Sequence, residues 1–288
     1  MRVVHTLSQS ERAERAEGAS LDEFPLYLHD SSKSVLVALA RNRHLREAEL
    51  LQLLERKDLP QEVVREIAPR KEVDHSYRLK LSLVCHPRTP RRISIPLLKF
   101  LFLFDLLKVC MGPAVPADIK RVAEEALLAR VERIPKGEKV TLARRGTGRI
   151  AASLLLGSDR DLRLAALENP FLGEAHLLKI LSRRDVDDDL IEIVASHPKW
   201  TQRYSIRLAL VRHPLTTFTR VREFVPNLTV SDLNVICQDR RISEEVRDFL
   251  SAHCRQRLAR GKKRPRKSAP AADSGKPDTP FDPTDDPV

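Results

Sequence analysis

Cysteine is scarce in this chain. Its four cysteines are scattered over 288 residues, and their spacing fits neither a disulfide framework nor a metal-ligand motif. Cys110 and Cys237 occupy equivalent positions of an internal duplication, and we expect both to be small core residues and not a redox pair. We therefore predict no metal and no other cofactor.

Glycine is also rare, with nine residues in the whole chain. No glycine-rich phosphate loop and no dinucleotide fingerprint is present. The segment "RRGTGR" (144–149) lies between two helical patterns, so we expect an inter-repeat turn there. Nine histidines occur, but none forms a His-Glu-x-x-His pattern. Because no specific catalytic constellation is found, we predict that the protein is not an enzyme.

No uninterrupted apolar run is long enough to suggest a membrane span. The most apolar stretch, 93–109, contains Pro96, Lys99, Asp105 and Lys108. We expect it to be a central buried helix. The alternative is an exposed patch that docks a partner, formed by Phe100, Phe102, Leu103 and Phe104. The N-terminal segment 1–17 has no sustained apolar core, so we expect no signal peptide and a cytoplasmic location.

The chain does contain an internal duplication. An ungapped shift of 127 residues aligns 42–127 with 169–254, and 21 of the 86 aligned pairs are identical, where chance gives about 6. The alignment pairs Tyr77 with Tyr204 and Cys110 with Cys237. We therefore expect the two segments to have the same helices in the same order.

Smaller units repeat inside each copy. Apolar runs end with Asn or His, as in "ALARN", "SLVCHP", "AALENP" and "LALVRHP", and the offset equals three units of about 42 residues. Between these breaks the apolar residues have helical spacing. We predict an all-α, right-handed α-solenoid of short helical pairs, of the HEAT/armadillo type. It covers residues 1–254, with similar halves at about 25–130 and 142–254.

The C-terminal tail, 255–288, differs from the rest. Residues 255–267 hold eight basic residues and no acid, and residues 268–288 are acidic and rich in proline, so we expect disorder. The basic run either attracts nucleic acid or an acidic partner, or is a solvated helix end. The candidates for such contacts are Lys262, Lys263, Arg264, Arg266 and Lys267.

The segment "KWTQRYSIR" (199–207) is the strongest candidate binding surface. Its aromatic and arginine residues recur every three or four positions, which predicts one helical face. Such residues are typical interface anchors and also stack on bases. The candidate anchors are Trp200, Arg203, Tyr204 and Arg207. Trp200, the only tryptophan, has a core position as its alternative.

Together these patterns resemble bacterial HEAT-like and leucine-rich-repeat-variant proteins. The resemblance rests on "ALENPFLGEAHLLKIL", "IVASHPKWTQRYSIRLALVRHPLTT" and "PKGEKVTLARR", and covers roughly residues 25–254. It implies a non-enzymatic scaffold that binds an unknown protein or peptide, because most such proteins are scaffolds. The alternative is a nucleic-acid-binding solenoid, for example a glycosylase-like DNA-repair protein. The iron–sulfur cluster of the variant family needs clustered cysteines that this chain lacks, so it is not carried over.

Overall fold

The structure is a computed structural model that describes residues 7–262. It is all-α, and this part of the chain contains no strand. The first ten helices are α1 (Gln9–Gly18), α2 (Phe24–Leu28), α3 (Lys33–Arg41), α4 (Glu47–Glu55), α5 (Gln61–Ile67), α6 (Lys71–His75), α7 (Tyr77–Cys85), α8 (Arg91–Leu98), α9 (Leu103–Met111) and α10 (Ala117–Val131).

The second ten are α11 (Lys136–Arg145), α12 (Gly148–Leu155), α13 (Arg160–Leu167), α14 (Glu174–Leu181), α15 (Asp188–Ser196), α16 (Pro198–Thr201), α17 (Tyr204–Arg212), α18 (Phe218–Phe224), α19 (Val230–Cys237) and α20 (Glu244–Lys262). A short 3-10 helix, Val225–Asn227, follows α18.

Several of these helices have a side-chain cap at the N-terminus. An oxygen of the residue before the helix accepts a hydrogen bond from a first-turn amide at Ser8, Ser76, Thr147, Asp159, Asp187 and Thr229. At the other end, α7 and α17 stop at His86 and His213, each followed by proline. The predicted helix ends at His-Pro are therefore confirmed, because proline cannot continue the preceding turn.

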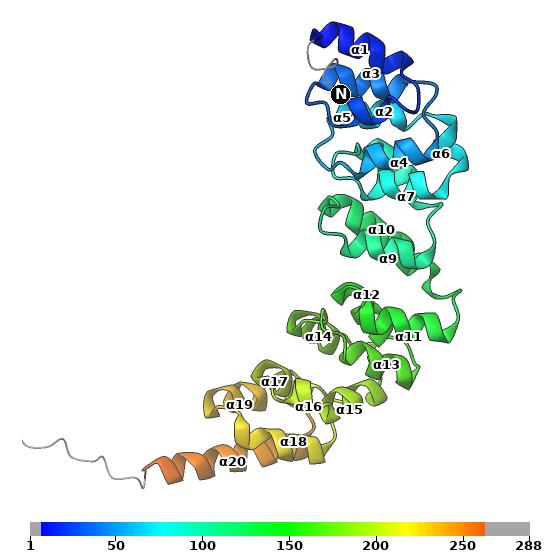
Figure 1. The fold of residues 1–288 in the computed structure, drawn as a ribbon. Helices are drawn as coiled ribbons and strands as arrows, with labels where there is room; N and C mark the ends of the chain where they lie inside the picture. The colour runs from blue at the N-terminus through cyan, green and yellow to red at the C-terminus, as the bar shows by residue number, and fades with distance from the viewer. Residues whose placement is uncertain (1–6, 263–288) are drawn as a thin grey trace, which may run out of the picture.

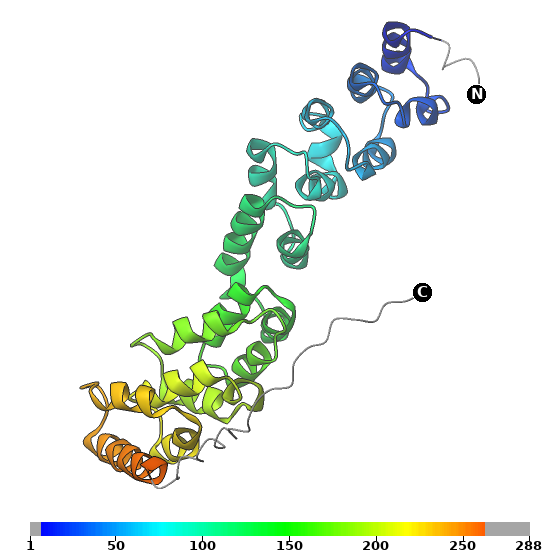
Figure 2. The same cartoon turned by 90° about the vertical axis from the view of Figure 1, so that its left-hand side faces the viewer.

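The helices form an elongated, bent array, with α1 at one end and α20 at the other (Figure 1, Figure 2). Contacts link α1 to α3 and α3 to α5, and separately α4 to α7 and α7 to α9. In the second half, α11, α13 and α15 form a row equivalent to that of α1, α3 and α5. A second row, α12, α14, α17 and α19, includes the equivalents of α4, α7 and α9. Each helix thus packs mainly on helices close to it in the chain.

The duplication extends over all twenty α-helices of the described residues. Nine of the ten pairs, from α1 with α11 to α10 with α20, begin at positions related by the offset found in the sequence. The remaining pair, α2 and α12, ends at positions related by that same offset. The predicted helix order is confirmed. The halves are longer than predicted, since α1 and α11 precede the expected starts at residues 25 and 142.

The polar contacts are duplicated as well. Asn42 Nδ2 donates to the carbonyl oxygens of Ala16 and Ala19 at 3.0 and 2.8 Å. Asn169 Nδ2 donates to the equivalent carbonyls of Ala143 and Gly146 at 2.7 and 3.0 Å. Both asparagines are completely buried. The recurring Asn at the end of an apolar run is therefore a buried link between successive helical units.

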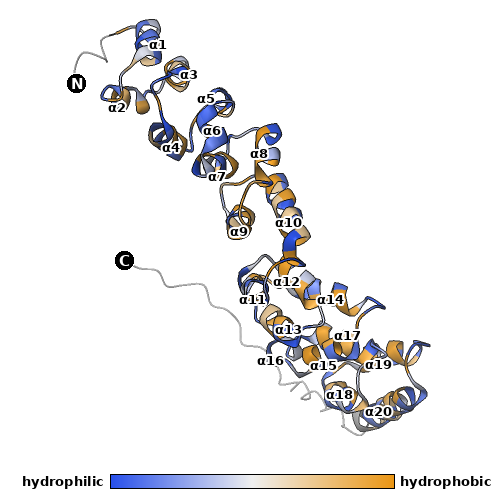
Figure 3. Ribbon diagram, turned by 90° about the vertical axis from the view of Figure 1, so that its right-hand side faces the viewer, coloured by the Kyte–Doolittle hydropathy of each residue, from blue (hydrophilic) through white to orange (hydrophobic). Residues whose placement is uncertain are grey.

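The core is continuous across the boundary between the halves. Most helices carry both polar and apolar residues (Figure 3). Their buried apolar side chains form one cluster within α1–α7 and another that runs from the end of α7 to α20. Leu127 of α10 and Leu142 of α11 belong to the same cluster. Cys110 is buried and Cys237 half-buried, each within the core of its own half.

Two expectations need correction. The stretch 93–109 is not one helix but α8 and α9, joined by a turn in which Phe100 and Phe102 are exposed and Leu101 is buried. Helix α20 continues past residue 254 to Lys262, so the array does not end where the tail was predicted to begin. Arg257 Nη1 donates to the Leu228 carbonyl, and this bond ties the extension to the segment between α18 and α19.

Candidate partner-binding site

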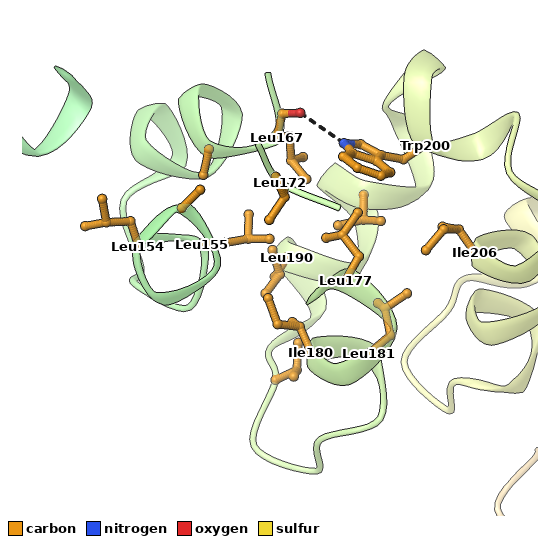
Figure 4. Close-up of a cluster of buried hydrophobic side chains, with 14 of the residues drawn as sticks. Leu154, Leu155, Leu167, Leu172, Leu177, Ile180, Leu181, Leu190, Trp200 and Ile206 are labelled. Carbon is orange, nitrogen blue, oxygen red and sulfur yellow. Dashed lines mark hydrogen bonds between the residues drawn. The ribbon is translucent and has the colours of Figure 1, made fainter. Parts of the chain in front are cut away.

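Trp200 is a core residue. Its side chain is 3 % exposed, and its indole Nε1 donates to the Leu167 carbonyl at 3.0 Å (Figure 4). It lies on α16, whereas Tyr204 begins the separate helix α17. The prediction that Trp200 shares one helical face with the other three candidates is therefore wrong, and its core alternative holds.

The other three candidates lie at the surface of α17. Arg203 is exposed at the residue before the helix, and Tyr204 is 37 % exposed. Arg207 is half-buried, and its Nε has no hydrogen-bond partner among the described residues. These side chains remain candidate anchors, although without the tryptophan.

Tyr204 is held by a contact that is duplicated in the first half. Its hydroxyl donates to Asp232 Oδ2, and the hydroxyl oxygen accepts from the Thr229 amide at 3.1 Å. In the first half the Tyr77 hydroxyl donates to Asp105 Oδ2 at 2.5 Å and accepts from the Phe102 amide at 3.0 Å. This tyrosine–aspartate pair thus joins α7 to α9 and α17 to α19.

The negative charge of Asp105 is stabilised by neighbouring side chains. Burial raises the pKa of Asp105, but hydrogen bonds from Lys108 and Tyr77 outweigh it, and the pKa is lowered overall. Burial and the bond to Asp105 raise the pKa of Tyr77. The carboxylate therefore stays ionised and the phenol protonated at neutral pH, as the hydrogen bond requires.

Beside the first pair lies a group of exposed phenylalanines, which we call the Phe surface. Phe100, Phe102 and Phe104 are 51 %, 68 % and 40 % exposed. Phe102 packs on Tyr77 with ring centroids 4.6 Å apart. For these three residues the exposed alternative for the stretch 93–109 is correct. Leu103 is half-buried against the core.

Two lysines border the Phe surface. Lys80 Nζ and Lys99 Nζ lie 5.0 and 4.9 Å from the centroid of the Phe100 ring. Among the described residues neither lysine makes an ion pair, although Lys80 donates to the Asp74 carbonyl at 2.7 Å. Lys108 is different, because it pairs with Asp105 at 2.7 Å. The surface thus carries two uncompensated positive charges.

The sequence alone did not indicate a buried arginine in α13. Arg163 is 2 % exposed and pairs with Asp187 and Asp189 at 2.5 and 2.8 Å. Its Nε donates to the Gly157 carbonyl at 2.7 Å. The equivalent residue in the first half is Leu36, so the duplication gave no signal for this site. We assign it a structural role, because all its contacts are internal.

Two open hollows lie near the N-terminus. The larger, of about 450 Å³, is lined by Gly18, Ser20, Leu21, Arg43, His44, Leu45, Arg46 and Glu72. The smaller, of about 400 Å³, is lined by Ala40, Arg41, Arg43, Glu66, Pro69, Arg70, Lys71 and Glu72. Both are lined mainly by polar and charged residues at the surface.

Other features bear on possible functions. Within residues 7–262 no group of three His, Cys, Asp or Glu side chains could hold a metal ion. No helix of this part of the chain has the length and apolar character needed to cross a membrane. Of the basic tail candidates, Lys262 is the last residue of α20, and Lys263, Arg264, Arg266 and Lys267 lie outside the described residues.

Comparison with protein families, curated proteins and solved structures finds no match to this chain. The resemblance to HEAT-like and leucine-rich-repeat-variant proteins stays a prediction. The candidate site therefore has to be interpreted from its own geometry.

Proposed function

We propose that this protein is a non-enzymatic scaffold, a right-handed α-solenoid of HEAT-like helical pairs that binds another protein along the row of helices containing α7, α9, α17 and α19. The duplicated two-row arrangement supports this proposal. Stacked helical units bury their cores against neighbours and leave a long surface for a partner.

The observation that carries the proposal is the Phe surface. Large exposed aromatic side chains that gather in one place mark interaction sites more often than scattered apolar residues do. Phe100 and Phe102 lie exposed in the connection between α8 and α9, and Phe104 lies exposed in the first turn of α9. The Phe102 ring packs on Tyr77, which is fixed by hydrogen bonds. Aromatic side chains held in place lose little entropy on binding and are frequent binding anchors.

Affinity capture from native cells tests the proposal. The full-length protein is immobilised and exposed to extract with and without nuclease. We expect a protein that is retained in near-stoichiometric amount after nuclease treatment. Capture that disappears with nuclease would instead support the nucleic-acid alternative, and then an oligonucleotide should bind with an affinity that falls steeply with salt.

Matched variants separate the two alternatives. Arg203→Ala with Arg207→Ala should leave the fold intact and weaken capture of a protein partner, because Arg203 is exposed just before α17 and the half-buried Arg207 has no hydrogen-bond partner at Nε among the described residues. Removal of residues 262–267 should leave protein capture unchanged, and would flatten the salt dependence if nucleic acid were the partner. Protein capture that is insensitive to the double arginine change would show that α17 is not part of the interface.

A further inference from the structure

We propose that the Phe surface binds an acidic peptide segment of a partner protein, with an apolar side chain of the peptide against Phe100, Phe102 and Phe104 and its carboxylates at Lys80 and Lys99. This inference rests on the proposed scaffold function and specifies the chemistry of the partner. Four observations lead to it.

First, the arrangement of the helices does not depend on these phenylalanines. The second half has the same helices and the same tyrosine–aspartate pair, yet the positions equivalent to Phe100, Phe102 and Phe104 hold Asn227, Thr229 and Ser231. A polar version of this surface is therefore compatible with the same backbone. The phenylalanines serve a purpose other than packing of the array.

Second, Phe102 occupies the N-cap position of α9, where the second half has a capping threonine. Thr229 caps α19, because its hydroxyl accepts from the Asp232 amide at 3.1 Å. Phe102 holds the same position before α9 and makes no side-chain cap. The α9 helix therefore gives up a hydrogen bond that its counterpart α19 has.

Third, the surface is organised before a partner arrives. The Phe102 amide donates to the Tyr77 hydroxyl, and the Phe102 ring packs on the Tyr77 ring. Asp105 fixes the same hydroxyl from α9. The fixed Tyr77 ring gives the Phe102 ring a surface to pack on, and ordering before binding lowers the entropic cost of complex formation.

Fourth, the charge of the surface defines the partner. Lys80 and Lys99 both approach Phe100 and make no ion pair among the described residues, so a partner with carboxylates beside its apolar anchor is complementary. A nucleic-acid strand presents a phosphate at every nucleotide and binds to longer runs of cations. Two lysines beside three phenylalanines favour a short acidic peptide.

Peptide display tests the inference directly. A library of random peptides is selected on the full-length protein and counter-selected on the variant F100N/F102T/F104S, which carries the residues of the second half. Because those residues suit the same backbone, the variant should fold, and urea unfolding checks this. We expect enriched peptides that combine acidic residues with Phe, Trp or Leu, and that bind the variant about tenfold more weakly or worse.

A charge exchange tests the role of the lysines. Lys99→Glu should weaken binding of an enriched peptide, and replacing an acidic residue of that peptide with Lys should restore binding to the Lys99→Glu protein. Lys179→Glu is the matched control. Lys179 is an exposed residue of α14, which packs on α12 and α17 in the second half, so this change should affect peptide binding little.

Several outcomes would overturn the inference. These are peptides that bind the triple variant equally well, enriched peptides without acidic residues, and a single-stranded oligonucleotide whose binding needs the three phenylalanines. Self-association abolished by the triple variant would identify a second copy as the occupant. Peptide binding that strengthens about tenfold in a chain shortened after Lys267 would identify the chain's own acidic segment, 268–288. A protein captured equally by wild type and triple variant contradicts this inference alone, whereas no protein capture contradicts the scaffold function.

Discussion

At the scale of single residues, the two halves show which side chains hold successive units together. Asn42 and Asn169 each donate to two carbonyl groups of the preceding helical unit and accept a hydrogen bond from the amide of the second residue after them. The sequence showed that an asparagine recurs at the end of an apolar run. It could not show the bonds, because their partners lie one helical unit away.

The buried asparagine should be essential for stability. Asn169→Ala leaves the carbonyls of Ala143 and Gly146 and the Phe171 amide without these partners. We expect a loss of about 2–4 kcal/mol in the free energy of unfolding, measured by urea denaturation. The exposed Asn227→Ala is the control and should change this energy by less than about 0.5 kcal/mol. Equal effects of both changes would contradict the structural role.

Two histidines at helix ends make stability depend on pH. The buried His86 accepts at Nδ1 from the Arg88 amide and donates from Nε2 to the Arg56 carbonyl, so the ring is neutral. Burial lowers the pKa of His86, and burial likewise lowers the pKa of the half-buried His213. The unfolded chain therefore binds protons first, near its pKa of about 6.5. Stability is fully present above that pH and is lost as the pH falls toward the lower folded-state pKa.

The test compares urea unfolding at about pH 7 and about pH 5. The wild-type protein should lose stability on acidification, and the double change His86→Gln with His213→Gln should reduce that loss. The exposed His44→Gln serves as the control and should retain the wild-type pH dependence. A double variant with an unchanged pH dependence would assign the effect to other groups.

The spacing of Trp200 and Tyr204 does not reveal that they lie on separate helices. Trp200 and Tyr204 have suitable spacing for one helix, but the chain turns at Gln202 and Arg203 and begins a new helix. Trp200 then donates to the carbonyl of Leu167, where the first half uses Arg70 to bind the equivalent carbonyl of Ala40. Different side chains satisfy the same backbone group, and such exchanges are invisible without the fold.

At the scale of helices, the N-terminal cap of α9 should be improvable. Phe102→Thr introduces the residue that caps α19 at the equivalent position. We expect the free energy of unfolding to rise by about 1 kcal/mol, while binding of a peptide to the Phe surface weakens. Phe104→Ser, within the first turn of α9, adds no cap and serves as the control. An unchanged or lower stability in Phe102→Thr would contradict the capping argument.

Two glycines should respond to the same substitution with opposite signs. A Cβ at Gly148, at the start of α12, would lie 2.3 Å from the Phe171 carbonyl oxygen. Gly148→Ala should therefore lose about 1–3 kcal/mol of unfolding free energy. Gly137 in α11 has no atom within 4 Å of such a Cβ, so Gly137→Ala should gain about 0.5–1 kcal/mol. Thermal or urea denaturation of both variants measures these changes. A Gly148→Ala variant with unchanged stability would contradict the close approach of the Phe171 carbonyl oxygen.

Helix positions were predictable where the sequence carries breaks. His-Pro marks the ends of α7 and α17. The stretch 93–109 was misjudged because apolar composition does not reveal a turn. Helix α8 ends at Leu98, and the exposed Phe100 and Phe102 lie in the connection before α9. The high hydrophobicity of this stretch therefore combines core residues, such as Leu98 and Leu106, with the exposed phenylalanines.

At the scale of the whole molecule, the duplication could be found from the sequence, but its extent could not. Helices α1 and α11 begin at equivalent positions, yet only two of their ten aligned pairs are identical, Glu11 with Glu138 and Ala16 with Ala143. Packing needs similar volume and helical spacing more than identity, so a backbone outlasts the sequence match. The same freedom allowed the surfaces of the two halves to differ while the tyrosine–aspartate pair stayed the same.

We propose that the duplicated array of helices carries a protein-binding surface in its first half. The most direct measurement is capture of a protein partner from nuclease-treated extract by the wild-type protein and by F100N/F102T/F104S, quantified side by side on proteins shown to be equally folded. We expect the triple variant to retain about one tenth of the partner or less. Equal capture by the two proteins would contradict it.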